Sequence, residues 1–495
     1  MPRPTGREAG QAATRSARRW ARLRPWLIPA VLLLCVTLPH LGDGDWQRGD
    51  SGWYTAIGVQ AWRTGELWTL MGEPGQSYFN KPPLVFWITG FVAWVFGPSA
   101  WAARLPTVAA ALGCVLATVG ITRVFATRRT ALTVGVVLAL SIEFFRRTRE
   151  VSLDLWQLVF LLLALWIAAG AVKDRRWRRL APAGVPIGLA LMCKPLVALL
   201  GPVAIAVWIV GIGETRRLGW VALMVGAALL IAGPWHLAMA LEHGGTFMRS
   251  YIGAEIAGRA GGGVGVTTET TPAFYLVQLG KAYWPWLLFV VLAVVTWARG
   301  KDMGRDGRAM VLALAWTLVW LAALSAFPDR RDRYALVLLP SLAMLAGLWL
   351  SRWPWAWLRV FSARAMRFGV PLACAGAVVF ALLPVRVQRP FDPQWPTLFA
   401  WMQHEGVTEL WQGGFYGYHG SRLYLQTGSW PITTRDRWGE ALPEPPEGAA
   451  IIYHQRDGLV PGSNESVVFH HRALTVTRLM GSRWSPIVVT DPGER

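Results

Sequence analysis

The sequence predicts a mainly α-helical, polytopic membrane protein with about 11 transmembrane helices, interfacial helices and a small C-terminal α/β domain. Of the 495 residues, 54% are hydrophobic and 16% are charged, whereas soluble domains average about 25% charged residues. Apolar runs that approach the ~20 residues needed to cross a ~30 Å hydrocarbon core recur along most of the chain. Only the tail beyond them is turn-rich and charge-balanced. A single soluble globule is therefore excluded.

The apolar runs define the expected spans. They lie near residues 25–40, 104–123, 130–145, 154–172, 181–193, 195–212, 219–240, 279–298, 308–326, 334–350 and 368–385. The span at 181–193 is short, so we expect neighbouring helices or local thinning of the bilayer to support it. An odd number of spans places the two termini on opposite sides of the membrane.

Basic residues set the orientation. The formal net charge is +20, and the surplus of Lys and Arg lies in segments that this topology puts on the cytoplasmic side, as the positive-inside rule requires. Counting the apolar stretch 84–97 as a span would invert every later loop, so we interpret it as a re-entrant or interfacial helix. Because membrane insertion accounts for the basicity, nucleic-acid binding is not indicated.

Three domains follow. Residues 1–24 form a basic cytoplasmic N-terminus that leads into a signal anchor, residues 25–385 form the transmembrane domain, and residues 386–495 form an extracytoplasmic α/β domain, periplasmic in a Gram-negative cell. In the tail we expect a helix at 396–406 and strands at 450–454 and 466–471. The four cysteines lie in or at the end of apolar segments, so neither a disulfide framework nor a cysteine metal site is indicated.

Ionisable groups near the hydrocarbon indicate function, because an unpaired charge there is costly. The first outer segment that carries such groups is the loop 41–83. Asp50 precedes apolar residues spaced as on an amphipathic helix (Trp53, Tyr54 and Ile57), which places its carboxylate at a helix N-terminus. The loop ends in Tyr78-Phe79-Asn80-Lys81-Pro82-Pro83. The structural alternative is that Asp50 only caps a helix and Lys81 only extends toward the interface.

Further charged groups adjoin other span ends. Three arginines lie in 146–149, against the positive-inside trend, and Asp154 opens the next span; the alternative for Asp154 is a simple helix charge. Lysine is scarce in this chain, yet Lys81, Lys194 and Lys281 are all expected outside. Arg333 and Tyr334 precede a later span. The long loop 241–278 carries Glu255 and Arg259 and either orders over a substrate or only connects two spans.

Carboxylates and cations on one membrane face suit one class of reaction. A sugar carried on a polyprenyl phosphate has an anionic leaving group, which Lys and Arg stabilise through charge-assisted hydrogen bonds. The attacking acceptor hydroxyl needs a carboxylate to take its proton. We expect Asp50 to be that base.

These residues resemble those of the polytopic C-type glycosyltransferases that use lipid-linked sugars, the superfamily of the lipid A aminoarabinose transferase and the protein O-mannosyltransferases. The resemblance covers roughly residues 41–350. It rests on Asp50, Tyr54, the 78–82 run, Asp154, Lys194 and the 331–334 segment. It implies inverting transfer to a lipid A-like or other envelope acceptor at the outer face of the bacterial inner membrane. It implies Asp50 and Asp154 as catalytic carboxylates and a donor-phosphate site made of Tyr78, Lys81, Lys194, Arg259, Arg333 and Tyr334.

Two departures from the family pattern bear on a metal. Ser51 replaces the second acid of the first pair, and Asn80 replaces a glutamate that pairs with a loop histidine around a metal in the aminoarabinose transferase. Glu255 stands near the corresponding place, so a divalent metal is left open and no other cofactor is expected.

The partners expected are the lipid-linked donor, a lipid or glycan acceptor and membrane lipids, with the chain acting as a monomer. The alternative function is a transporter or flippase of an anionic lipid-linked substrate. A transporter would place polar groups near the middle of the membrane, and few ionisable residues lie within the expected spans.

Overall fold

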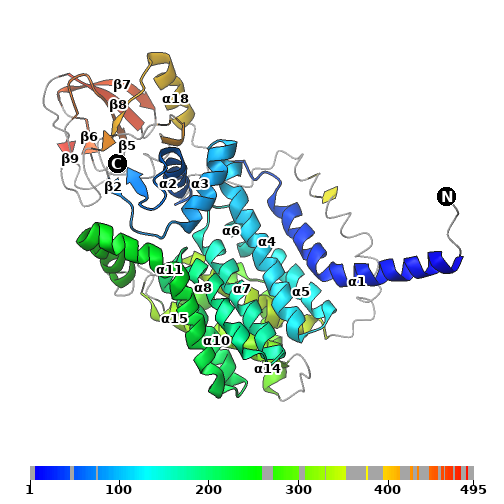
Figure 1. Ribbon diagram of the computed structural model, residues 1–495. Helices are drawn as coiled ribbons and strands as arrows, with labels where there is room; N and C mark the ends of the chain where they lie inside the picture. The colour runs from blue at the N-terminus through cyan, green and yellow to red at the C-terminus, as the bar shows by residue number, and fades with distance from the viewer. Residues whose placement is uncertain are drawn as a thin grey trace. The chain divides into compact units, whose positions relative to one another are not determined.

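The computed structural model (Figure 1) divides into two compact units. The first comprises Met1–Leu41, Phe79–Val85 and Arg104–Val385; the second comprises Gly42–Tyr78, Phe86–Ala103 and Arg386–Arg495. The structure describes residues 6–44, 50–73, 76–258, 271, 273–299, 307–328, 330–352, 375–376, 379, 394–412, 424–426, 428, 432–433, 445–454, 459–461, 463–471, 474–480 and 487–488.

Within the described residues, the regular secondary structure of the first unit is helical. Its first half contains α1 (Gly6–Thr37), most of α4 (Ala100–Phe125), α5 (Arg128–Ala139), α6 (Ile142–Thr148), α7 (Leu153–Lys173), η1 (Trp177–Ala183), α8 (Gly184–Leu191), α9 (Pro195–Ala198) and α10 (Leu200–Gly211). Its second half contains η2 (Thr215–Arg217), α11 (Leu218–Phe247), the π-helix η3 (Met248–Gly258), α13 (Phe274–Ala282), α14 (Trp286–Ala298), α15 (Gly307–Ala326), η5 (Asp332–Leu338) and α16 (Leu339–Leu350).

Small residues allow these helices to approach closely. Helix α8 packs against both α7 and α11 (Figure 1). A Cβ atom on Gly184 would lie 2.1 Å from the carbonyl oxygen of Met224, so the backbones of α8 and α11 are in direct contact there. Such close approach is how helices associate in lipid, where apolar side chains gain little by leaving the solvent.

Five described helical segments are long and apolar enough to cross a membrane, or six if the pair α13 and α14, bent by 117°, is one span. They are Ala100–Phe125, Leu153–Lys173, Thr215–Gly258, Gly307–Ala326 and Asp332–Leu350. Of the other expected spans, 25–40 corresponds to the second half of α1, and 130–145 is divided between the short helices α5 and α6. The expected span 368–385 lies largely outside the described residues. The fold is thus a mainly helical membrane architecture, and the count of eleven stays a prediction.

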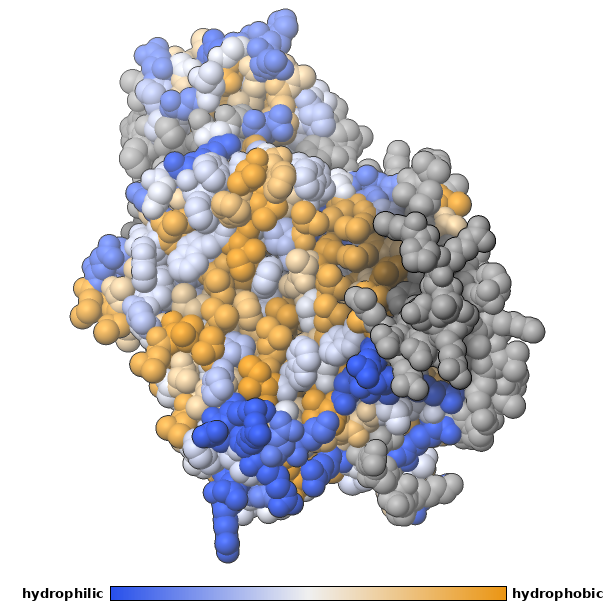
Figure 2. All heavy atoms as spheres, turned by 45° about the vertical axis from the view of Figure 1, so that its right-hand side comes forward, coloured by the Kyte–Doolittle hydropathy of each residue, from blue (hydrophilic) through white to orange (hydrophobic). Residues whose placement is uncertain are grey.

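Large parts of the surface are apolar, as contact with lipid requires. On the face drawn in Figure 2, hydrophobic side chains (orange) cover a broad area, and hydrophilic ones (blue) gather below it. Helix α11 contributes strongly exposed leucines, with Leu230 at 78% and Leu241 at 77% exposure. An exposed apolar area of this kind is rare on soluble monomers and indicates contact with membrane or another protein.

The second unit begins with α2 (Ser51–Thr64), the short strands β1 (Met71–Glu73) and β2 (Gln76–Ser77), and α3 (Leu84–Phe96). Our expectation of an amphipathic α2 lying in the interface needs correction, because residues 54–59 are all buried. Two contacts bury α2. Helix α3 packs directly on it at Gly58 and Gly90, and Tyr424 and Leu425 pack with Ala56 and Val59. At 13 residues, α3 is about 20 Å long, shorter than a membrane is thick.

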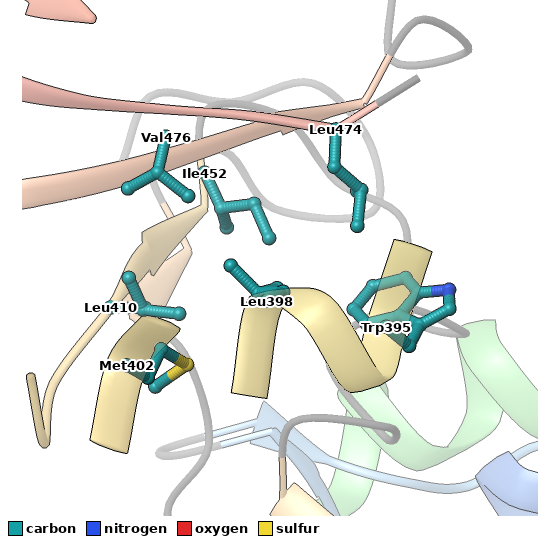
Figure 3. Packing of buried hydrophobic residues seen from close by; sticks show 7 residues of the cluster. All are labelled: Trp395, Leu398, Met402, Leu410, Ile452, Leu474 and Val476. Carbon is teal, nitrogen blue, oxygen red and sulfur yellow. The ribbon is translucent and has the colours of Figure 1, made fainter. Parts of the chain in front are cut away.

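The tail contributes α18 (Gln394–Glu405) and the strands β3 (Trp411–Gln412), β4 (Ile432–Thr433), β5 (Ala450–His454), β6 (Leu459–Val460), β7 (Glu465–His471), β8 (Leu474–Leu479) and β9 (Ile487–Val488). The helix and the two strands expected here are thus present. Five strands form a mixed sheet in the order β4-β3-β5-β8-β7, and β6 pairs with β9. Trp395, Leu398 and Met402 of α18 pack on one face of the sheet (Figure 3).

The contact between α2 and α3 yields a prediction. A Cβ atom on Gly90 would lie 2.2 Å from the carbonyl carbon of Gly58. Because backbone cannot move aside as a flexible side chain can, Gly90→Ala is expected to destabilise the protein by about 1–3 kcal/mol. Thermal unfolding of the purified chain in detergent measures the effect.

The matched control is Gly170→Ala in α7, where an added Cβ meets nothing within 4 Å. Alanine is the better helix former, so this variant is expected to gain about 0.5–1 kcal/mol. If both variants shift stability by the same amount, the close contact of α2 and α3 does not exist.

Candidate active site

The first element of the site is an ion pair between α7 and the start of α9. The Lys194 ammonium donates to Asp154 Oδ1 at 2.8 Å, and the two side chains are only 13% and 18% exposed. The Lys194 ammonium also lies 4.2 Å from the ring centroid of Tyr334. Gln157, one turn after Asp154, donates its side-chain amide to the carbonyl oxygen of Lys194. Both the backbone and the side chain of Lys194 are therefore positioned by α7.

Local sequence explains this arrangement. The Ser152 hydroxyl accepts from the N–H of Leu155 at 3.2 Å and so caps α7 just before Asp154. Pro195 at the first position of α9 fits a helix start, because its missing N–H would have no partner there. Asp154 and Lys194 thus lie at the beginnings of two helices.

The second element is the pair of Lys81 and Glu255. The Lys81 ammonium donates to the carboxylate of Glu255 and, at 3.1 Å, to the carbonyl oxygen of Asn80. The side chains are 8% and 11% exposed. Lys81 and Glu255 are 174 residues apart in the sequence, so only the tertiary fold brings them together.

An aromatic cluster holds Glu255 in place. Helix α11 breaks at Gly244, whose φ of 46° is in the region that glycine adopts most readily. Beyond the break, Phe247 and Tyr251 stack on each other, and Tyr251 shares a 2.8 Å hydrogen bond with His236. Phe79, two residues before Lys81, packs edge-on against Phe247. The same cluster therefore anchors both the Lys81 segment and the helix that carries Glu255.

The two lysines line one cavity. Its polar wall consists of Lys81, Lys194, Glu255 and Tyr334, and its apolar wall includes Leu196, Leu200, Ile256, Leu324 and Phe327. An adjoining cleft contains Asp154, Arg333 and again Tyr334. The two hollows together hold three cations and two carboxylates. A net positive cavity with apolar walls suits an anion attached to an apolar chain.

The arginines of 146–149 prove to have structural partners. Arg147, which is nearly buried, forms ion pairs with Glu143 at 2.6 Å, Glu150 at 3.2 Å and Asp332 at 2.8 Å. Burial alone would lower the pKa of Arg147, but these three carboxylates together raise it above its usual value. Arg149 donates to the carbonyl oxygens of α1's last residue, Thr37, and of Pro39. Internal pairing therefore explains why these arginines break the positive-inside trend.

Asp50 and Tyr78 belong to the second unit. Asp50 is the N-cap of α2, as expected, and its Oδ2 accepts from the Tyr54 hydroxyl at 3.0 Å. Tyr78 packs edge-on against Phe86 and Trp53. Arg259 lies outside the described residues. Of the nine residues chosen from the sequence, the first unit thus brings six together: Lys81, Asp154, Lys194, Glu255, Arg333 and Tyr334.

The described residues do not fit a metal centre. Within them, no group of three His, Cys, Asp or Glu side chains is close enough to hold a metal ion. Glu255, our candidate ligand, contacts the Lys81 ammonium instead. We therefore derive no step through a metal.

Sequence reasoning missed the supporting residues Gln157 and Tyr251, and it named Phe79 in the 78–82 run without giving it a role. Gln157 follows Asp154 at the i+3 position, on the same face of α7, which is a signal that could have been used. Tyr251 carried no such signal, because aromatic residues are common throughout this chain.

The chain resembles known proteins in sequence and in fold. Residues 80–237, which include Lys81, Asp154 and Lys194, match the family described as dolichyl-phosphate-mannose-protein mannosyltransferase. The structure of ArnT from Cupriavidus metallidurans bound to undecaprenyl phosphate superposes with a TM-score of 0.68, covering 91% of this chain and 97% of that one at 17% identity. The chain thus has the fold of the ArnT structure.

Two further relatives extend the comparison. The archaeal oligosaccharyltransferase AglB from Archaeoglobus fulgidus superposes with a TM-score of 0.55 at 12% identity, over 85% of this chain and 65% of that one. An undecaprenyl phosphate-alpha-4-amino-4-deoxy-L-arabinose arabinosyl transferase of Pseudomonas fluorescens (strain Pf0-1) is 28% identical over 341 residues, 66% of this chain. The match spans 58% of that relative's length.

The ion pair of Asp154 and Lys194 makes the second prediction. Asp154→Asn leaves a nearly buried ammonium without its carboxylate, which is expected to cost about 3 kcal/mol of stability. The double variant with Lys194→Gln should recover part of that loss, because the two sites share one interaction. Thermal unfolding in detergent compares the stability of the unaltered protein, Asp154→Asn and the double variant.

The control is the exposed pair of Arg179 and Asp174, whose nitrogen and oxygen are 2.9 Å apart with side chains 46% and 44% exposed. Asp174→Asn is expected to change stability by less than ~1 kcal/mol. Equal effects of Asp154→Asn and Asp174→Asn would show that the inner pair contributes no more than a surface contact.

Proposed function

We propose that this protein is a membrane glycosyltransferase that moves a sugar from a polyprenyl phosphate to an acceptor of the cell envelope. One observation carries the proposal: Lys81 and Lys194 line a single cavity with apolar walls, in a chain whose fold matches a structure solved with undecaprenyl phosphate bound. A cationic hollow beside apolar side chains complements a lipid phosphate in both charge and polarity.

The charges favour the donor over a free phosphate. The cations Lys81, Lys194 and Arg333 face the carboxylates Asp154 and Glu255, which leaves an excess of one positive charge. A sugar joined to a lipid through phosphate is a phosphodiester with a single negative charge. When the glycosidic bond breaks, the lipid keeps a phosphate monoester of about −1.5 to −2. The lysines are therefore placed to bind the charge that grows as the reaction proceeds.

The chain's carboxylates take two different roles in this proposal. Asp50 accepts the proton of the acceptor hydroxyl as its oxygen attacks the anomeric carbon, and the lipid phosphate departs from the opposite face, which inverts the configuration. Asp154 positions Lys194 through their ion pair. Tyr78 and Arg259 complete the set that we assign to the donor phosphate.

We also propose the finer features expected from the sequence. The chain crosses the inner membrane of a bacterium about eleven times, with its N-terminus in the cytoplasm. Residues 386–495 form an extracytoplasmic α/β domain, and a lipid A-like molecule or another envelope glycan is the acceptor of the monomeric enzyme.

Asp50→Asn is expected to abolish transfer, since an amide cannot take the acceptor's proton. Transfer from an undecaprenyl-phosphate-linked sugar is measured in proteoliposomes with envelope lipids as acceptors. The control is Glu66→Gln, which removes an exposed carboxylate just after the same helix. Undiminished turnover in the Asp50 variant would exclude it as the base.

Substitutions of Lys81 and of Glu255 should change the affinity for a lipid phosphate in opposite directions. Lys81→Gln removes a charge-assisted donor and is expected to raise the Kd for undecaprenyl phosphate roughly tenfold or more. Glu255→Gln removes the carboxylate that competes for the same ammonium, so the Kd should fall. Titration of the purified variants with undecaprenyl phosphate gives both values, and a shift of both in the same direction would contradict the assignment.

A further inference from the structure

A second cavity of about 270 Å³ lies where α6, α13 and η5 meet. Its polar lining consists of Glu143, Arg146, Gln278, Lys281 and Asp332, and apolar residues such as Leu279 and Ala335 complete it. It shares no lining residue with the cavity of Lys81 and Lys194. Lys281, one of the scarce lysines noted in the sequence, plays no part in the transfer proposed above.

The carboxylates of this cavity are already engaged. Glu143 accepts from Arg147 at 2.6 Å through Oε1 and from Arg146 at 2.8 Å through Oε2. Asp332 accepts from Arg147 at 2.8 Å through Oδ2 and from the N–H of Arg333 at 2.7 Å through Oδ1. All four carboxylate oxygens thus have a donor, so the carboxylates are poor partners for an incoming cation.

The cations keep unused hydrogen-bonding capacity. Lys281 is exposed, and its ammonium has no ion-pair partner within the described ranges. Arg146 is half exposed and uses one of its five N–H donors on Glu143. The cavity therefore offers several cationic donors and no free acceptor of comparable strength, which is the pattern that binds an anion.

The surroundings indicate that the anion arrives from the membrane. Ile142, which also lines the cavity, is 61% exposed, and Trp284, three residues after Lys281, is 63% exposed. Leu276 and Leu288, on α13 and α14, also project outward. Exposed apolar residues around a tryptophan are typical of the membrane interface, where lipid headgroups lie.

We propose that the cavity of Arg146, Gln278 and Lys281 binds the phosphate headgroup of an anionic membrane lipid, at a site separate from the donor cavity. The lipid's phosphate contacts Lys281 and Arg146, and its acyl chains lie along the exposed apolar residues of α13 and α14. Asp332, which lines this cavity, accepts from Arg147 and from the N–H of Arg333, so its carboxylate stays engaged when the lipid binds.

The test uses the full chain in phosphatidylcholine nanodiscs, titrated with phosphatidic acid and followed by native mass spectrometry. Lys281→Gln is expected to raise the Kd for phosphatidic acid roughly tenfold, whereas the Kd for undecaprenyl phosphate stays unchanged. The control Lys173→Gln removes an exposed lysine at the end of α7 and should leave both values as they are.

Three outcomes would overturn the proposal. The first is an unaltered affinity for phosphatidic acid in Lys281→Gln. The second is an equal loss of phosphatidic acid and undecaprenyl phosphate, which would mean that the two sites are not separate. The third is displacement of phosphatidic acid by inorganic phosphate at equal concentration, which would assign the site to free phosphate rather than to a lipid headgroup.

Discussion

The ion pair between Lys194 and Asp154 is the interaction on which the candidate active site depends. A charged group this close to hydrocarbon is stable only with a partner, and the 2.8 Å contact supplies one. The same contact joins α7 to the turn before α9, and the Tyr334 ring lies against the Lys194 ammonium. Helix α7, the turn before α9 and η5 therefore meet at the Lys194 ammonium, which lines the cavity.

Pairing with carboxylates or with backbone carbonyls accounts for the buried arginines Arg147 and Arg149 of the first unit. Arg147 forms ion pairs with three carboxylates, and Arg149 donates to backbone carbonyls at the last residue of α1 and just beyond it. Around Lys81 and Lys194, by contrast, cations outnumber carboxylates. An anionic substrate can bind where such an excess remains, whereas fully paired clusters serve mainly to hold helices together. This difference separates functional from structural charge in a protein where both occur at membrane depth.

Breaks in regular helices place the remaining site residues. Gly244 interrupts α11, and the stacked rings of Phe247 and Tyr251 direct η3 so that Glu255 reaches Lys81. A continuous helix over the same residues would carry Glu255 further along the axis of α11. In the second unit, Gly58 and Gly90 permit a backbone contact that buries α2 and the residues following Asp50. The apolar composition of the chain thus favours helices, and glycines decide where they bend and touch.

The sequence by itself determined the membrane class, the helix that begins after Asp50 and the identity of six residues that line the cavity of Lys81 and Lys194 or its adjoining cleft. Hydrophobic run length, capping positions and scarce charges are local signals, which is why they can be recognised in the sequence. Only the tertiary structure decided which charges pair. Lys81 and Glu255 are 174 residues apart, and the partners of Arg147 come from two helical elements and the loop between α6 and α7. Helix lengths also depended on tertiary packing, since a helix supported by neighbours can be shorter than the membrane is thick.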